Sequence, residues 1–569
     1  IRWHIYLPTA LFQLAIVLML GTIVYQSLQI KLSSGYAKVV LLEIAVTCLV
    51  FHLIYQIPYF GLRGTDAYSD MASAKGILSS GFIMGAPQYI NGTSPWPMIH
   101  VLGTQLSLIT GLKLFTVVKW FPSLIDVALI LLLYLLVRKI FKNEKVALLS
   151  ALLFTCLQHH ILFSSLFIRE TITLVLMVGC LYLYFSARSS AHPATCYTLS
   201  IMCLIGTTLA HHFTSFILLI FLLIHFLVTR ASKLPALRKT YFETDTAGGK
   251  IGIAFLLLAC LLPLVYWISG GIQPPVTAPG IQAPGIQAPG IQVTGTLSRF
   301  TSTFFTPSKW GTSYADIANI SFTSIQTSGG LFFFLGFWLF IVIFGIILLQ
   351  RLMPKAQNPR LETYSFTLFL FLCGLGGFLG LYFIPVPIYP DRFLMFGWLF
   401  GSAPLVIAIL AFNRRWLRRI GIGLLAAFML FNIYWIEPTA WNARAEGVPA
   451  ATSEQDYALA NTFDFSDRTI VAHQNELMAI YDVHNNLGRN IFASKSSDLS
   501  KFDWIIVQKK ALKLEQKYHP EPRTEAIAKM EQLIEEGSPD RNNIYQSNTL
   551  MVFKKSETIF DHIKEIGGY

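Results

Sequence analysis

Charged side chains are scarce in this sequence, which excludes an ordinary soluble protein. Asp, Glu, Lys and Arg make up 13% of the 569 residues, whereas apolar residues make up 54%. A transmembrane helix needs about 20 predominantly apolar residues, and the chain has many runs of this kind. We therefore expect a mainly helical, multi-pass protein of the cell membrane.

Cysteine is sparse as well, with seven residues in the chain. All of them lie in or beside apolar runs, and the long polar loop and the C-terminal part contain none. Disulfide frameworks and zinc modules need closely spaced cysteines in polar segments. We expect no structural disulfide and no cysteine zinc site.

The basic residues do not form one patch, although the formal net charge is +12. They fall in short clusters between apolar runs, as in the segments 138–145 and 414–419. Cytoplasmic loops of membrane proteins have this pattern. We therefore expect membrane lipids and no nucleic acid as partners.

The apolar runs predict about twelve membrane spans. Ile1 would then lie outside, and we hypothesise a thirteenth span upstream that returns the start of the chain to the cytoplasm. The segment Trp96–Leu114 is too short and too polar for a span, so we expect a helix at the outer interface. The predicted spans are 7–28, 38–57, 121–137, 146–160, 171–186, 197–211, 213–229, 251–269, 330–349, 364–385, 393–412 and 420–436.

Alternate connections between these spans are rich in Lys and Arg, and we place them in the cytoplasm. The first outer loop, 58–120, and the long loop, 270–329, then face outside. Two glycosylation-type sequons, at Asn91 and Asn319, fall on this side. The long loop holds the repeat APGIQ three times between Ala278 and Gln292. Its prolines and glycines prevent regular structure, and we expect a mobile tether, with a substrate lid as the alternative.

The composition changes at residue 437 from apolar to water-soluble. We predict a transmembrane domain over 1–436 and a small extracytoplasmic α/β domain over 437–569. Capping and periodicity predict helices at Ser453–Phe463 and Thr524–Glu536. Apolar alternation predicts strands at Thr469–Ala472, Trp504–Gln508 and Leu550–Phe553.

Ionisable residues near the spans collect at their outer ends in this topology. Such residues usually mark a site or line a hydrated cavity, and we expect one polar cavity that opens outside. Glu43 and His225 are exceptions nearer the inner side. The collected residues are Asp66, Asp70, His100, Lys119, Asp126, His159, His160, Arg169, Glu170, His211, His212, Asp391 and Arg392.

Asp66 and Asp70 lie four residues apart in the segment GTDAYSD. On a helix that begins at Thr65 they share one face, near the positive end of the helix dipole. This spacing suits a general base that removes a proton from a hydroxyl or amide nucleophile. It also suits a divalent metal ligand. The alternative is a helix-start carboxylate with a solvated neighbour.

The remaining candidates suit an anion or a metal. Arg392, in the segment PDRF, is placed to recognise a phosphate on a lipid carrier, or else to reach the headgroups. His159, His160 and Glu170 bracket a broken apolar run, and His211 and His212 mark another outer turn. These side chains could bind substrate or a metal, although the spacing is not a metal motif.

Together, GTDAYSD, the Arg169-Glu170 pair, the late Asp391-Arg392 turn and the polar C-terminal part resemble the GT-C superfamily of membrane glycosyltransferases. The resemblance covers the whole chain and implies a polyprenyl-phosphate-linked sugar donor. It implies that Asp66 is the catalytic base and that Arg392, helped by Arg169, binds the donor phosphate. The second acidic motif of the family is replaced here, which leaves the need for Mg²⁺ or Mn²⁺ open.

The resemblance leads us to expect an inverting glycosyltransferase that acts on a lipid, glycan or protein acceptor at the outer face. No two tryptophans are adjacent, so the tryptophan-rich signature of oligosaccharyltransferases is absent. Transfer of a larger glycan therefore stays an alternative. A lipid or solute transporter or flippase is another, although we find no second copy of the Asp66 loop. A non-catalytic scaffold is the third.

Overall fold

The computed structural model describes most of the helical part of the chain and the strands of a C-terminal sheet. The described residues are 3–29, 33–57, 62, 65–81, 97–187, 190–231, short pieces between 255 and 265, 361–382, 390–412, 414–434, 470–472, 489–490, 504–508, 541–546 and 550–555. The chain divides into two compact units. The first comprises Ile1–Gln56 and Ser69–Pro438, and the second comprises Ile57–Tyr68 and Thr439–Tyr569.

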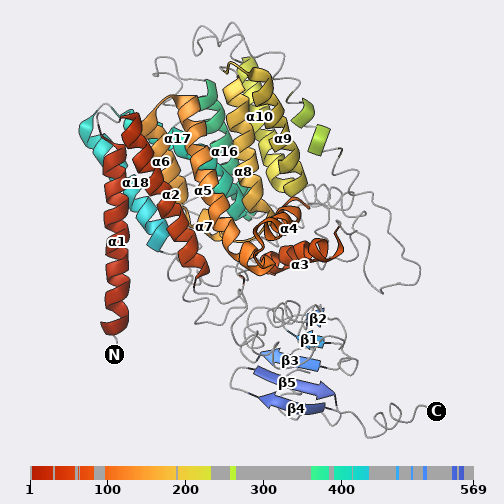
Figure 1. Ribbon diagram of the computed structural model, residues 1–569. Coiled ribbons are helices and arrows are strands. Elements are labelled where there is room, and N and C mark those ends of the chain that lie inside the picture. Colours follow the sequence, from red (N-terminus) through yellow and green to blue (C-terminus); the bar gives the residue numbers. More distant parts are fainter. Residues whose placement is uncertain are drawn as a thin grey trace, which may run out of the picture. The chain divides into compact units, whose positions relative to one another are not determined.

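The first unit is a bundle of helices (Figure 1). Five helices of the described part are long and apolar enough to cross a membrane, within α2, α5, α8, α9 and α10. The longer helices are α1 (Trp3–Ser27), α2 (Ser34–Gln56), α5 (Leu114–Phe141), α8 (Arg169–Ala187), α9 (Pro193–Ala210), α10 (His212–Ala231), α16 (Leu361–Tyr382), α17 (Pro390–Leu410) and α18 (Arg415–Tyr434). The predicted spans 251–269 and 330–349 and the repeat loop 270–329 lie outside the described residues, apart from fragments near 260.

One predicted span is wrong. The segment 146–160 is not a single helix, because α6 (Glu144–Thr155) ends before α7 (Gln158–Ser164) begins. Leu157 between them is extended, with φ −75° and ψ 119°. Twelve residues rise about 18 Å, which is short of the roughly 30 Å hydrocarbon layer. The polar residues at the end of this segment therefore belong to a separate helix, α7.

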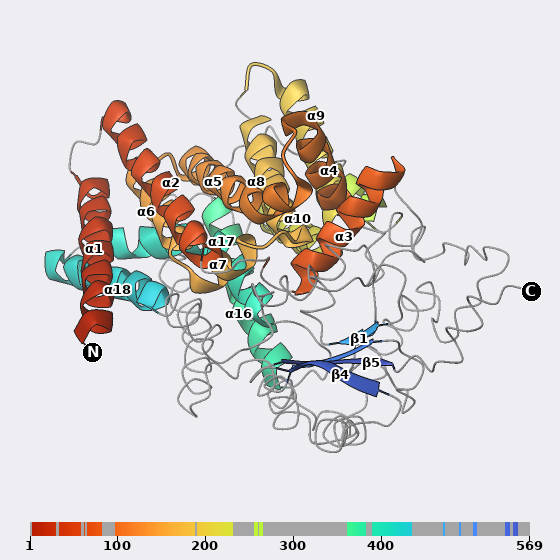
Figure 2. The same ribbon diagram turned by 60° about the horizontal axis from the view of Figure 1, so that its bottom comes forward.

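Two short helices lie across one end of the bundle. They are α3 (Thr65–Ser80) and α4 (Met98–Thr110), and Figures 1 and 2 both place them beside each other. The 13 residues of α4 are too few for a span, as predicted for this segment. One side of α4, with Ile99, His100 and Thr104, is buried, whereas Leu108 and Ile109 are exposed.

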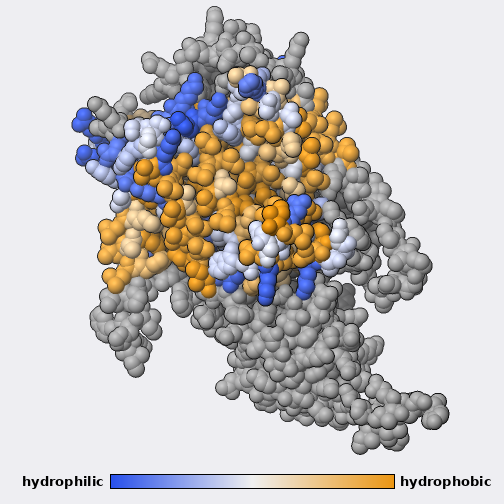
Figure 3. Space-filling view, viewed as in Figure 1, coloured by the Kyte–Doolittle hydropathy of each residue, from blue (hydrophilic) through white to orange (hydrophobic). Residues whose placement is uncertain are grey.

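Apolar side chains cover the flank of the bundle. Figure 3 shows them as a broad band with hydrophilic residues toward the two ends. Leu42, Leu199 and Leu424 are among the exposed apolar residues. The interior is filled by aromatic side chains, with Phe221 stacked on Phe400 at 4.5 Å between ring centroids. A surface of this kind fits a lipid environment.

The second unit contains a five-stranded sheet of order β2-β1-β3-β5-β4. The pairs β2–β1 and β1–β3 are parallel, whereas β3–β5 and β5–β4 are antiparallel. Three strands coincide with predicted ones, while β2 and the polar β4 have no apolar alternation and were not predicted. The predicted helices of this part lie outside the described residues. The strands are β1 (Ile470–Ala472), β2 (Arg489–Asn490), β3 (Trp504–Gln508), β4 (Arg541–Gln546) and β5 (Leu550–Lys555).

Candidate functional site

A buried carboxylate, Asp70, lies at the centre of the polar residues at the α3–α4 end of the bundle. It is on α3, one helical turn after Asp66, and its residue is 1% exposed. His100 of α4 donates from Nε2 to Oδ1 of Asp70 at 2.8 Å, and this histidine is also buried. The bond joins the two short helices through a single oxygen. Oδ2 of Asp70 has no hydrogen-bond partner in the described part of the chain.

Arg169 brings a positive charge to the same carboxylate. It is the first residue of α8, and its Nε lies 3.8 Å from Oδ1 of Asp70. Its side chain is 21% exposed, so solvent or a ligand can reach the guanidinium. We call Asp70, His100 and Arg169 the Asp70 cluster. In this cluster the Asp70 carboxylate contacts both the Arg169 guanidinium and the His100 imidazole. His100 thereby fixes the carboxylate that positions the arginine.

The next residue along α8 makes a second acid–base pair. Oε1 of Glu170 lies 3.3 Å from Nε2 of His211, and both side chains are buried. His211 follows α9 in an extended conformation, and its Nδ1 lies 2.9 Å from the hydroxyl of Thr214 at the start of α10. Arg169 thus connects the start of α8 to α3, and Glu170 connects it to the turn between α9 and α10.

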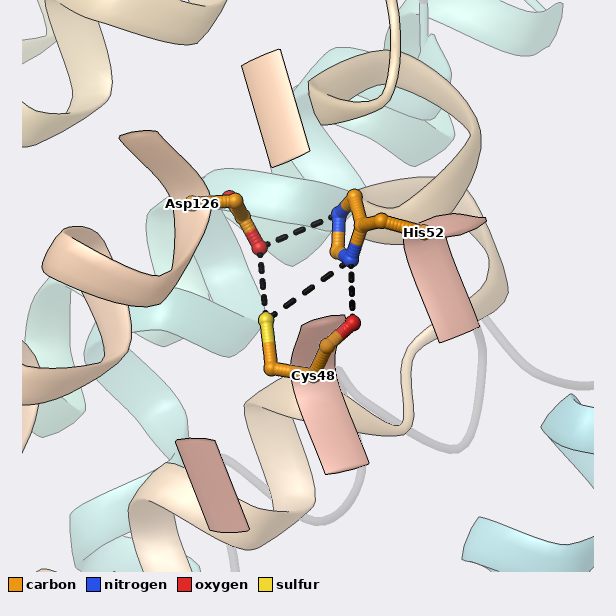
Figure 4. Close-up of side chains that lie close together, drawn as sticks. All are labelled: Cys48, His52 and Asp126. Atoms are coloured by element: carbon orange, nitrogen blue, oxygen red, sulfur yellow. Dashed lines mark hydrogen bonds and ion pairs between the residues drawn. The ribbon is translucent and has the colours of Figure 1, made fainter. Parts of the chain in front are cut away.

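A further polar group lies inside the bundle, on α2, α5 and α7 (Figure 4). Oδ2 of Asp126 lies 3.1 Å from Nε2 of His52 and 2.9 Å from Nε2 of His160. The thiol of Cys48 contacts the same oxygen at 3.1 Å. We call Cys48, His52, Asp126 and His160 the Asp126 cluster. Each of these residues is at most 1% exposed.

The structure brings together some of the candidates from the sequence. Asp70 meets Arg169, and Glu170 meets His211. His160 belongs instead to the Asp126 cluster, so the two histidine pairs and the acidic pair do not form a single metal site. The side chains of Asp66, His159, His212 and Arg392 lie outside the described residues. Of these, the backbone puts Asp66 in the first turn of α3 and Arg392 in the first turn of α17.

Sequence reasoning did not select Cys48 and His52. Cys48, His52 and Gln56 follow one another at intervals of four on α2, so they share one helix face. A polar stripe of this spacing within a predicted span is the signal that could have found them. His100 and Asp126 were noted as ionisable residues but received no role.

The Asp70 cluster fits an anion better than a metal ion. Oδ1 of Asp70 already faces a histidine and an arginine, and a cation placed there would be repelled by the guanidinium. The carboxylate of Glu170 is paired with His211. A guanidinium that is partly open and held in place by a buried carboxylate suits a phosphate.

Comparison with known proteins places the fold in a class. No family model and no curated protein matches the sequence. Among solved structures, the chain has the GT-C-like fold of membrane glycosyltransferases. The likeness concerns the fold, because the identities are 13% or lower.

The particular structures are two of oligosaccharyltransferase from one archaeon and one of a protein bound to undecaprenyl phosphate. The Archaeoglobus fulgidus oligosaccharyltransferase tethered with an acceptor peptide has TM-score 0.50 and 13% identity, over 92% of this chain and 75% of its own. The AglB complex from the same organism with an inhibitory peptide and a dolichol-phosphate has TM-score 0.49 and 13% identity, over 93% and 75%. ArnT from Cupriavidus metallidurans bound to undecaprenyl phosphate has TM-score 0.41 and 9% identity, over 92% and 99%.

Proposed function

We propose that the chain is a membrane glycosyltransferase that transfers a sugar from a polyprenyl-phosphate-linked donor to an acceptor at the outer face. The observation that carries this proposal is the Asp70 cluster at one end of a GT-C-like bundle. There Arg169 stays partly exposed beside a buried carboxylate, at 3.8 Å. A lipid phosphate that enters from the bilayer would meet a fixed positive charge at this end.

Arg169 binds the donor phosphate in this proposal. A guanidinium pairs with two phosphate oxygens at once, and charge-assisted bonds of this kind are stronger than neutral ones. Asp70 and His100 act as positioning residues, because they hold the arginine without needing to touch the donor. Arg392, at the start of α17, is the second cation for the phosphate. Its role comes from the sequence pattern and the family resemblance.

Asp66 is the proposed catalytic base. Asp70, one turn later on α3, already has His100 and Arg169 as partners, which favours a holding role for Asp70 and leaves the proton transfer to Asp66. The acceptor hydroxyl loses its proton to the Asp66 carboxylate as its oxygen attacks the anomeric carbon. The bond from that carbon to the phosphate oxygen breaks, and the departing polyprenyl phosphate takes the electron pair. Arg169 and Arg392 stabilise its charge.

Transfer of a larger glycan is the second candidate. The fold likeness at TM-score 0.50 is to an oligosaccharyltransferase, which favours this alternative. The absence of adjacent tryptophans in the chain favours transfer of a single sugar. The donor that the protein accepts separates the two candidates.

Sugar transfer by the purified full chain in lipid nanodiscs tests the proposal. Labelled donors are offered with either one sugar on a polyprenyl phosphate or an oligosaccharide on a polyprenyl pyrophosphate, and both sugar transfer and release of the lipid phosphate are measured. We expect turnover of the first donor and its loss in Asp66→Asn. The matched control is Glu43→Gln, another carboxylate-to-amide change, at a residue that meets Gln26 on α1.

Undiminished transfer by Asp66→Asn contradicts the base assignment. Movement of an intact lipid donor across a vesicle membrane without cleavage supports a flippase and contradicts the transferase. Turnover of only the oligosaccharide donor moves the assignment to transfer of a whole glycan.

A further inference from the structure

The Asp126 cluster joins three helices inside the bundle, and the proposed function does not use it. Cys48 and His52 come from α2, Asp126 from α5 and His160 from α7. Figure 4 shows the side chains of Cys48, His52 and Asp126 pointing toward one another. One donor atom from each of these three residues lies within 4.8 Å of the other two.

The distances within the cluster are close to those between the ligands of a small metal ion. Sγ of Cys48 lies 3.1 Å from Oδ2 of Asp126. Nε2 of His52 lies 3.1 Å from the same Oδ2. Ligand atoms around tetrahedral zinc are about 3 to 4 Å apart, given bond lengths of about 2.0 to 2.3 Å. Small side-chain movements would therefore admit an ion.

The backbone decides which nitrogen of His52 is protonated. Nδ1 of His52 lies 2.8 Å from the carbonyl oxygen of Cys48, and a carbonyl only accepts, so Nδ1 must carry the proton and donate. In a neutral histidine Nε2 is then an acceptor, and it lies 3.1 Å from a carboxylate oxygen of Asp126, which is also an acceptor. The hydroxyl of Ser164 lies 2.7 Å from the same Nε2, but it also lies 2.6 Å from the carbonyl oxygen of His160, and its one proton can serve only one of them. When that proton goes to the carbonyl, a cation, either a proton or a metal, is needed between Nε2 and Asp126. Histidines that bind metals commonly donate their other N–H to a backbone carbonyl, as His52 does.

Other polar atoms of the cluster lack hydrogen bonds. Oδ1 of Asp126 and Nδ1 of His160 have no hydrogen-bond partner in the part of the chain that the structure describes. Nε2 of His160 lies 2.9 Å from Oδ2 of Asp126. Buried polar atoms are nearly always satisfied, and ionisable residues within a membrane bundle usually have a function. Two such atoms beside a carboxylate that already faces a thiol and two imidazoles favour a cation at this position.

We infer that the Asp126 cluster is a binding site for a transition-metal ion, with zinc as the best match to its donors. A thiolate and imidazoles are ligands that zinc prefers, whereas Mg²⁺ and Ca²⁺ take oxygen ligands. On binding, the thiol of Cys48 releases its proton as the sulfur–metal bond forms. The charges of the thiolate and the Asp126 carboxylate then balance a divalent ion, which suits a buried site. Cys48, His52 and Asp126 are the core ligands, and His160 completes four.

The ion fixes α7 against α2 and α5. Because α7 directly precedes α8, which begins at Arg169, the metal site supports the helix that carries the exposed cation of the Asp70 cluster. The expectation from sequence that no cysteine zinc site exists rested on the position of all cysteines in or beside apolar runs, and the proposed site departs from that expectation. The site proposed here combines one cysteine with residues from distant helices, and it does not depend on the glycosyltransferase proposal.

Metal content and cobalt spectroscopy test the site. The full chain is purified in detergent without chelators, and its zinc is measured by mass spectrometry. We expect about one zinc per chain. Replacing zinc by Co²⁺ should produce a thiolate-to-metal charge-transfer band that is lost in Cys48→Ser and kept in Cys373→Ser, since Cys373 is a buried cysteine of α16.

X-ray absorption of the wild-type zinc protein keeps the inference testable if the Cys48 variant does not fold. A spectrum with one sulfur and three nitrogen or oxygen neighbours supports the site. The inference is overturned if the wild-type chain binds no zinc after reloading, or if folded Cys48→Ser keeps the cobalt thiolate band. An imidazolium signal from His52 that persists in NMR after the chain is reloaded with zinc also overturns it, because a bound metal would have displaced that proton.

Discussion

Asp70 is a carboxylate with almost no access to water, and its neighbours decide what it can do. His100 bonds to one oxygen at 2.8 Å, while the guanidinium of Arg169 lies farther away, at 3.8 Å. A buried carboxylate that loses its hydrogen-bond partners destabilises the folded state, because its desolvation is then no longer compensated. The histidine therefore stabilises the buried carboxylate, whereas the side chain of Arg169 is 21% exposed, as a role in binding the donor requires.

Replacing His100 tests the first half of this argument. We expect His100→Ala to lower the free energy of unfolding by about 1 to 3 kcal/mol, because Asp70 is left buried without its main partner. Thermal unfolding in detergent measures the loss. The double variant Asp70→Ala/His100→Ala should lose less than the sum of the two single variants. If the loss in the double variant equals the sum of the two single losses, the Asp70–His100 hydrogen bond contributes nothing to stability.

Replacing Arg169 tests the second half. Arg169→Ala should raise KM for the polyprenyl-phosphate donor about 10- to 100-fold, the equivalent of one charge-assisted bond. Arg138→Ala is the matched control, because Arg138 pairs with Glu144 at 2.7 Å near the end of α5 and should leave KM unchanged. An unchanged KM in Arg169→Ala would remove the phosphate-binding role.

At this scale the sequence selected residues but did not predict their partners, and the functional roles of those residues stay predictions. Asp70, Arg169, Glu170 and His211 were selected because charges near span ends are costly. Their pairing depends on how five helices pack, and no local pattern encodes it. His52 was missed because one polar residue in an apolar run changes the average hydropathy little.

Among the elements, the Asp70 cluster combines the short helices α3 and α4 with the start of the longer helix α8. The long helices were predicted from apolar runs because a bilayer demands runs of fixed length. The break between α6 and α7 was not, since the apolar run continues through it. Val146 to Thr155 of α6 are all buried, so this short helix is enclosed by protein, and burial permits an interrupted backbone there.

Gly103 sets the position of α4. A Cβ at this residue would lie 2.7 Å from Cζ of Phe167, whose ring is buried. Gly103→Ala should therefore lower the free energy of unfolding by about 1 to 3 kcal/mol through overpacking, as thermal unfolding would report. Gly21→Ala is the control, because no heavy atom lies within 4 Å of its added Cβ. Adding Phe167→Leu to Gly103→Ala should restore stability, and failure of this rescue would contradict the steric explanation.

For the whole molecule, the family resemblance predicted a fold that no local feature specifies. A few short motifs and the distribution of charge led to a GT-C-like bundle, which the structural comparison supports at 13% identity. The meeting of Asp66 and Arg392 stays a prediction, because it depends on two segments 326 residues apart (392 − 66). Long-range placement of this kind depends on packing, which periodicity does not contain.

Orientation in the membrane is the property of the whole molecule that the lysine and arginine pattern predicts. Helix α5 has 28 residues, about 42 Å, so Lys113 before it and Lys142 after it should emerge on opposite sides of a bilayer. In a chain in which the native cysteines other than the buried Cys48 are replaced, we expect Lys113→Cys to react with an impermeant maleimide from outside in intact cells. Lys142→Cys should react only after permeabilisation, because its loop is rich in basic residues. The reverse labelling pattern would invert the topology and put the Asp70 cluster in the cytoplasm, where the proposed acceptor at the outer face could not reach it.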